Sequence, residues 1–249
     1  MDIWAACREA VDPSRHQGEL LRMVESQEQI ATRALVDDLA EQALLEQLLE
    51  QSKPPLPAGS GHLDYLLASP FRYPPLEYGS RFGNRFEPSL FYGALETSSV
   101  LAETAFYRLV FWSGMSLPPP AGRLTTEHTL FAANYDTDRG LSLHLPPFDN
   151  YREFLTNPTS YAATQSLGSE MRAAGIELFI YRSARDPQSG LNIGLFNATP
   201  FIDGRSTWKQ AWLCDVSDDE VAFYNVSLGT TVFKRELFLV DGKLPAPAS

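Results

Sequence analysis

The stretch "SRFGNRFEPSLFYGALETSSVLAE" (residues 80–103) indicates the fold class and contains the first candidate site residues. Its core "SLFYGAL" predicts a short buried strand, and the run 98–112 that follows has apolar residues at helical spacing. Tyr92 stands eleven residues after Arg81 and eleven residues before Glu103. A loop arginine, a strand tyrosine and a helix glutamate therefore occur close together in the sequence.

The rest of the chain after residue 61 consists of short apolar runs separated by Pro, Gly and Asn. A further helix is predicted over 160–175, ending at Gly175. Strands outnumber helices and do not alternate with them regularly, which favours an α+β fold with a mixed or split β-sheet and flanking helices. The strands are predicted over 122–135, 139–146, 176–185, 191–197, 209–217 and 230–240.

The N-terminal segment has a different texture. Residues 19–52 contain no Gly or Pro and place apolar residues at helical spacing, which predicts one bent helix or two consecutive helices. The proline-rich run 53–61 ends them. We therefore expect a helical N-terminal extension over 1–56 and a catalytic domain over 57–249. The extension is acidic. It forms either a helix pair with a solvated acidic face or a docking surface for a partner or a second copy of the chain. A homodimer is therefore one of the alternatives.

Composition excludes several classes of function. The net charge of −11 argues against a protein that binds nucleic acid through a basic face. Two distant cysteines, Cys7 and Cys214, do not suit a disulfide framework or a cysteine zinc site, and four scattered histidines do not suggest another metal site. With no secretory signal and no apolar run of bilayer length, we expect a cytoplasmic protein that does not enter a membrane.

A second stretch, "IYRSARDPQSGLNIGLFN" (residues 180–197), complements the first. It places Arg182, Ser183 and Arg185 at the end of a predicted strand, where sites are commonly built. Arginines bind diphosphates, and a lone carboxylate can stabilise an oxocarbenium ion. Nicotinamide leaves NAD+ as a neutral amide and needs no general acid. This set of side chains therefore suits cleavage of the N-glycosidic bond of NAD+, although the same residue types also occur in ordinary surface ion pairs.

The two stretches together resemble the RES domain family over roughly residues 65–240. The pair Arg81-Phe82, the strand residue Tyr92 and the helix residue Glu103 match its first block. The segment "YRSAR…GLNIGLFN" is similar to its second block, with Ser183 as its serine and Asn192 after it. The chain departs from the family pattern at Ser80, where a glycine is usual, and offers Arg85 as a rival to Arg81.

The resemblance implies a fold like that of ADP-ribosyltransferases and a toxin that depletes NAD+. Its partner would be an Xre-type helix-turn-helix antitoxin. NAD+ would be the substrate, with no further cofactor and either phosphate or water as acceptor. We expect Arg81, with Arg85 or Arg182, to hold the diphosphate, and Tyr92 to pack on the nicotinamide or its ribose. Further predicted contacts are Ser183 with the ribose or a phosphate, Glu103 beside the ribose C1′, and Arg72 and Asn192 with the substrate.

Three alternatives stay open beside this interpretation. One is transfer of ADP-ribose to a protein, which would use the same site. Another is a protein that binds the antitoxin without catalysis, although the complete set of Arg, Tyr, Glu and Ser argues against it. The third is a secreted effector with the same chemistry.

Overall fold

The computed structural model describes residues 2–26, 35–57 and 59–245. Within these residues, eight strands form one mixed sheet in the order β1-β2-β5-β4-β3-β6-β7-β8, with an additional pairing between β1 and β3. All neighbours are antiparallel except β3 and β4. The strands are β1 (Ser14–Glu25), β2 (Phe91–Ala94), β3 (Arg123–Ser142), β4 (Leu178–Arg182), β5 (Leu191–Leu195), β6 (Trp208–Ser217), β7 (Glu220–Asn225) and β8 (Gly229–Lys234).

Helices flank this sheet, so the predicted α+β class is confirmed. The resemblance to ADP-ribosyltransferases in detail stays a prediction. The α-helices are α1 (Ile3–Cys7), α2 (Leu39–Ser52), α3 (Tyr65–Arg72), α4 (Thr97–Ser113), α5 (Arg152–Leu155) and α6 (Ala162–Ala173); short 3₁₀ turns are η1 (Arg8–Ala10), η3 (Phe148–Tyr151) and η4 (Arg235–Phe238).

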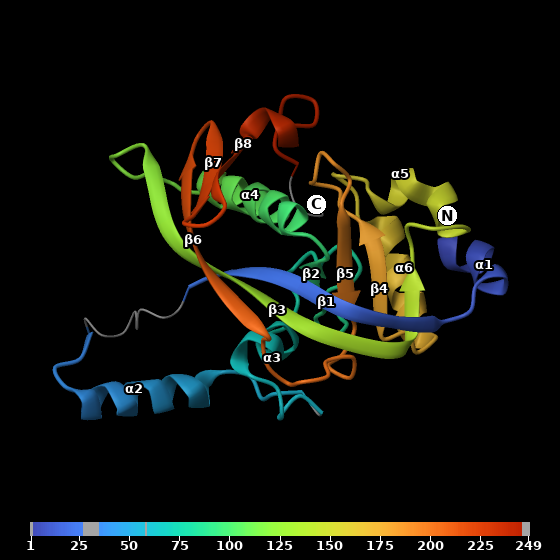
Figure 1. The fold of residues 1–249 in the computed structure, drawn as a ribbon, viewed down its shortest axis with the longest axis horizontal. Helices are drawn as coiled ribbons and strands as arrows, with labels where there is room; N and C mark the ends of the chain where they lie inside the picture. Colours follow the sequence, from blue (N-terminus) through green and yellow to red (C-terminus); the bar gives the residue numbers. More distant parts are fainter. Residues whose placement is uncertain (1, 27–34, 58, 246–249) are drawn as a thin grey trace.

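The long strand β3 organises the sheet. Residues 123–132 pair with β6, residues 128–140 pair with β1, and the last three residues pair with β4. Strand β1 also reaches β2 through the pair Leu21 and Ala94. Strands β1, β2, β5, β4 and β3 therefore close on one another, whereas β6, β7 and β8 extend the sheet to one side (Figure 1).

Helix α4 is held against the extended side of the sheet by a large apolar cluster. Phe106 and Leu109 of the helix pack with Trp212 of β6 and Phe223 of β7, and all four side chains are buried. The helix begins after Glu96, which makes no side-chain capping bond. Ser99 lies in the first turn of the helix, and its hydroxyl donates to Asp186 Oδ2. The packing fixes the direction in which Glu103 points.

The predicted helix over residues 19–52 is wrong for its first part and confirmed for its last. Residues 14–25 form strand β1. Leu20 and Leu21 are adjacent, and both are buried, in different apolar clusters. At this point the sequence therefore lacks the alternation of apolar and polar residues that indicates a strand. Helix α2 does form, capped by the Asp38 carboxylate. The part of the prediction over 27–34 lies outside the described residues.

The expected extension over 1–56 is therefore not purely helical, and β1 belongs to the same sheet as the strands that follow residue 57. A domain boundary at residue 57 stays a prediction. In the described part of the chain, no helix has the length and apolar character needed to cross a membrane.

Candidate active site

A cleft of about 1000 Å³ opens where the closed part of the sheet meets α3 and α4. Its walls come from β1, from the loop at residues 78–83, from β2 and from α4, and Asn192 of β5 reaches it. Five residues predicted from the sequence fall in or beside this cleft. Arg81, Tyr92, Glu103 and Asn192 line it, and Ser183 is hydrogen-bonded to Glu103. The fold thus gathers residues that lie up to 111 positions apart in the chain.

Glu103 of α4 carries the carboxylate of the cleft. Its Oε1 accepts a hydrogen bond of 2.6 Å from the Ser183 hydroxyl and another of 2.6 Å from the Asn192 amide nitrogen. Within the described residues, its Oε2 accepts no hydrogen bond and Glu103 forms no ion pair. Two donors on one oxygen orient the carboxylate while the second oxygen keeps its lone pairs for a ligand.

Ser183 serves this carboxylate rather than the cleft itself. Its hydroxyl oxygen accepts hydrogen bonds from the backbone N–H groups of Arg185 (3.0 Å) and Asp186 (2.9 Å). A serine hydroxyl has two lone pairs and one proton, so the proton is directed to Glu103. The expected contact of Ser183 with a ribose or phosphate is not supported by this geometry, because its bonding capacity is already used.

Tyr92 of β2 holds the loop that precedes it. Its hydroxyl bonds Ser80 Oγ at 2.8 Å and accepts from the Phe82 N–H at 3.0 Å, on both sides of Arg81. Burial raises the pKa of Tyr92 to about 12, so the phenol is neutral at ordinary pH. The tyrosine hydroxyl therefore holds the residues on both sides of Arg81 and so positions this arginine.

Two arginines line the cleft without carboxylate partners in the described residues. Arg81 stacks on the Tyr161 ring at 4.4 Å and donates to the Asn157 carbonyl at 2.8 Å. Arg185 lies over the Phe106 ring at 3.7 Å and donates to the Pro158 carbonyl at 2.8 Å. Rings and carbonyls fix the guanidinium groups without neutralising them, so both keep their positive charge for an anionic ligand.

Sequence reasoning missed Arg22, a third arginine of the cleft. It lies on β1, in the segment that we predicted as helix, and donates to the Tyr92 carbonyl at 2.8 Å. Its guanidinium lies over the Phe91 ring at 4.8 Å, and its buried Nε finds no hydrogen-bond partner among the residues that the structure describes. Burial lowers the pKa of Arg22 to about 10, which still leaves it charged at neutral pH. The signal was a lone arginine inside the apolar run "ELLRMV".

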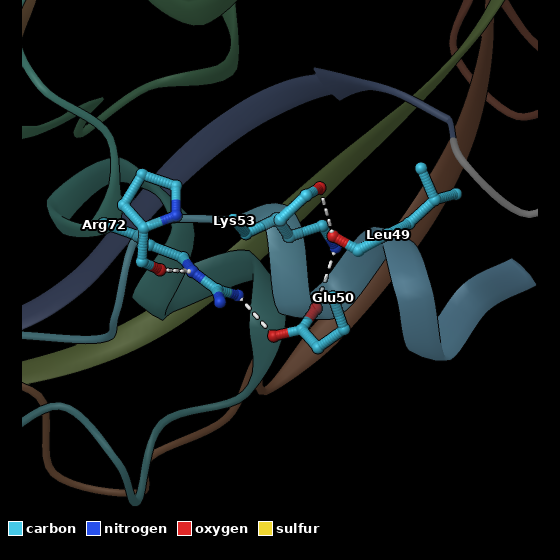
Figure 2. A network of polar contacts seen from close by, with 6 residues as sticks. Leu49, Glu50, Lys53 and Arg72 are labelled. Atoms are coloured by element: carbon cyan, nitrogen blue, oxygen red, sulfur yellow. Dashed lines mark hydrogen bonds and ion pairs between the residues drawn. The ribbon is translucent and has the colours of Figure 1, made fainter.

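The remaining predicted arginines do not line the cleft. Arg72 of α3 pairs with Glu50 of α2 at 2.6 Å and bonds the Pro54 carbonyl (Figure 2), so it joins α2 to the body. Arg85 lies over the ring of the exposed Phe86, and Arg182 makes a long contact of 3.4 Å with the Ser189 carbonyl. The structure thus places Arg81, and not its rival Arg85, on the cleft.

Asn192 contributes a second free acceptor. The residue is 3 % exposed, its amide nitrogen donates to Glu103, and its buried Oδ1 has no hydrogen-bond partner in the described part of the chain. A buried acceptor without a donor is costly, and it marks the place where a ligand hydroxyl or amide would bind. Elsewhere in the described residues, no three His, Cys, Asp or Glu side chains gather as metal ligands.

Comparison with protein families identifies the chain. The family model described as the RES domain matches residues 57–217. This chain belongs to the RES domain family. RES domains are associated with toxin–antitoxin systems. The match includes Arg81, Tyr92, Glu103 and Ser183, whereas β1 with Arg22 precedes it. The comparison with curated proteins found no match.

Proposed function

We propose that this RES domain protein cleaves the bond between nicotinamide and ribose in NAD+. The observation that carries the proposal is Glu103, whose Oε1 is held by two donors and whose Oε2 has no partner in the described residues. It stands in a cleft with three arginines that no described carboxylate neutralises. One carboxylate and several cations suit a substrate that has a diphosphate and develops positive charge at a sugar carbon.

In the proposed reaction, Arg22, Arg81 and Arg185 bind the diphosphate. The C1′–N bond breaks with its electron pair passing to the nicotinamide, which leaves as a neutral molecule. Glu103 stabilises the positive charge that develops on the ribose. An oxygen of phosphate or water then forms the new bond at C1′, and in the case of water a proton is released. Asn192 Oδ1 would accept a hydrogen bond from a ribose hydroxyl or from the nicotinamide carboxamide.

Depletion of NAD+ would make the protein the toxin of a toxin–antitoxin pair, as the family association suggests. The partner we propose is an Xre-type antitoxin that covers the cleft. This part of the proposal rests on the family rather than on the geometry of the cleft.

The decisive experiment incubates the purified protein with NAD+, with and without phosphate, and separates the products by chromatography. Replacing Glu103 by Gln keeps the shape of the side chain and should lower the rate about 10²–10³-fold. Glu153→Gln, at an exposed position on α5, serves as the matched control and should match the parent.

The products distinguish the possible acceptors. ADP-ribose-1-phosphate formed only with phosphate indicates phosphorolysis, and free ADP-ribose indicates hydrolysis. Intact NAD+ after incubation with folded protein contradicts the proposal. Labelled protein after incubation with NAD+ and a cell extract would then favour transfer of ADP-ribose to a macromolecule.

A further inference from the structure

Two side-chain hydrogen bonds join α4 to the loop between β4 and β5 (residues 183–190). Ser99 donates to Asp186 Oδ2 at 2.7 Å, and Ser183 donates to Glu103 Oε1 at 2.6 Å. Ser99 and Glu103 are four residues apart in the helix, so they lie on one face of it, one turn apart. The loop is thus fastened to α4 at two points, and one of them is the carboxylate of the cleft.

Asp186 is the residue that connects these two points. It is 7 % exposed, and its carboxylate accepts bonds from Ser99, from the Gln188 N–H at 2.9 Å and from the Gly190 N–H at 3.2 Å. Its own N–H donates to Ser183 Oγ at 2.9 Å. A buried carboxylate with this many donors is strongly held, because losing any of them leaves a charge poorly solvated.

The contact leaves no free space around Asp186. A Cβ atom on Gly190 would lie 2.0 Å from Ser99 Oγ and 2.6 Å from Asp186 Oδ2. Only a residue without a side chain allows the loop to approach α4 this closely. The sequence "DPQSG" therefore does more than form a turn, since its first and last residues together form the contact with Ser99.

We propose that Asp186 is a positioning residue for Glu103 and acts through Ser183. By fastening the loop to α4, Asp186 holds the Ser183 oxygen under two backbone donors, which directs the only hydroxyl proton to Glu103. If the loop moves, the hydroxyl can rotate away, and one of the two bonds that orient Oε1 is lost. Asp186 does not line the cleft. Its catalytic consequence rests on the proposed function, whereas its hold on Ser183 does not.

Kinetics of NAD+ cleavage test the catalytic consequence. Asp186→Asn keeps the size of the side chain but replaces one of its two acceptor oxygens by a donor, and kcat should fall roughly tenfold or more while KM changes less than about twofold. Ser99→Ala, which removes the tie to α4, should act in the same direction. Asp215→Asn is the matched control, because Asp215 also accepts two side-chain bonds but lies on β6 away from the cleft.

A double variant separates positioning from a general effect on stability. If Asp186 acts through Ser183, then Asp186→Asn should slow the Ser183→Ala protein by less than about twofold, since residues that act together are not additive. If the rate reductions of Asp186→Asn and Ser183→Ala multiply in full in the double variant, the proposal is overturned. It is also overturned if the Asp186→Asn and Ser99→Ala proteins have the kcat of the parent.

Hydrogen exchange gives a readout that needs no activity. Peptides covering residues 183–192 should exchange faster in Asp186→Asn and in Gly190→Ala, while peptides from α6 exchange as in the parent. Parent-like exchange in 183–192 would overturn the proposal even if the kinetics changed. A parent protein that leaves NAD+ intact would instead contradict the proposed function, and exchange would still decide whether Asp186 holds Ser183.

Discussion

Arg22 of β1 donates a hydrogen bond of 2.8 Å to the main-chain carbonyl of Tyr92 in β2. The two residues are 70 positions apart, and only Tyr92 falls within the segment that matches the family. The N-terminal strand therefore supplies one of the cations of the cleft and is bonded to the strand that positions another. The cleft therefore depends on strand β1 as well as on the segment that matches the family.

Replacing Arg22 should weaken substrate binding more than catalysis. In Arg22→Gln the cleft loses a cation, and KM for NAD+ should rise about tenfold or more, which is typical for a hydrogen bond to a charged group. Steady-state kinetics measure this. Arg15→Gln on the same strand is the control, because Arg15 is exposed and pairs with Asp136 outside the cleft. Equal KM values for the Arg22→Gln and parent proteins would remove Arg22 from the substrate site.

Loss of the Tyr92 hydroxyl should reduce both stability and activity. Tyr92→Phe leaves the N–H of the fully buried Phe82 without its acceptor, which costs about 1–3 kcal/mol in the free energy of unfolding. Arg81 lies next to Phe82, so KM should rise as well. Thermal unfolding and kinetics test the two effects, with Tyr224→Phe on the exposed face of β7 as control. Lower activity at unchanged stability would assign Tyr92 to the ligand alone.

His128 should make the protein less stable in mild acid. Burial, with a smaller contribution from nearby Arg108, lowers its pKa to about 4 in the folded protein, below the value of an unfolded histidine. The unfolded chain then binds more protons than the folded one between about pH 6.5 and 4, so stability is complete above that window and falls as the pH drops through it.

Urea unfolding at pH 7.5 and pH 4.5 measures this contribution of His128. Carboxylates also titrate in this range, so the parent must be compared with His128→Gln, which cannot be protonated. The loss of unfolding free energy on acidification should be roughly 2–3 kcal/mol smaller in the variant. The same loss in both proteins would show that His128 does not cause the acid sensitivity.

Gly168 of α6 should not tolerate a side chain. A Cβ atom there would lie 1.9 Å from the Phe82 carbonyl oxygen, which is main chain and cannot turn aside. Gly168→Ala should therefore destabilise the fold by at least about 1–3 kcal/mol and displace the loop that carries Arg81. Gly114→Ala is the control, since its Cβ would meet only ordinary contacts at 3.5 Å. A midpoint of urea unfolding equal to that of Gly114→Ala would contradict this reason for the glycine.

Most elements beyond residue 61 could be predicted, because the local sequence pattern of each agrees with the structure that it forms. The runs that became α4, α6, β4 and β5 show helical spacing or continuous apolar character between turn residues. Strand β1 could not be predicted, because its two buried residues, Leu20 and Leu21, are adjacent and its apolar residues fit helical spacing equally well. Its role depends on pairing with β3, more than a hundred residues later.

The site was predictable in its residue types more than in its geometry. Arg81, Tyr92, Glu103, Ser183 and Asn192 were all selected from the sequence, and the fold brings them together. The separate role of each of these residues could not be predicted from the sequence. Whether an arginine faces a ligand or, like Arg72, joins two helices depends on contacts between distant segments, and the same holds for the hydroxyl of Ser183.

The closed arrangement of β1, β2, β5, β4 and β3 also has a consequence for biosynthesis. Strand β1 leaves the ribosome first, yet its principal partner β3 ends at residue 142 and the strand with Asn192 follows later still. A nascent chain cannot assemble the cleft until Asn192 of β5 has been translated. If the proposed chemistry is correct, the cell gains an interval in which an antitoxin can be present before NAD+ is at risk.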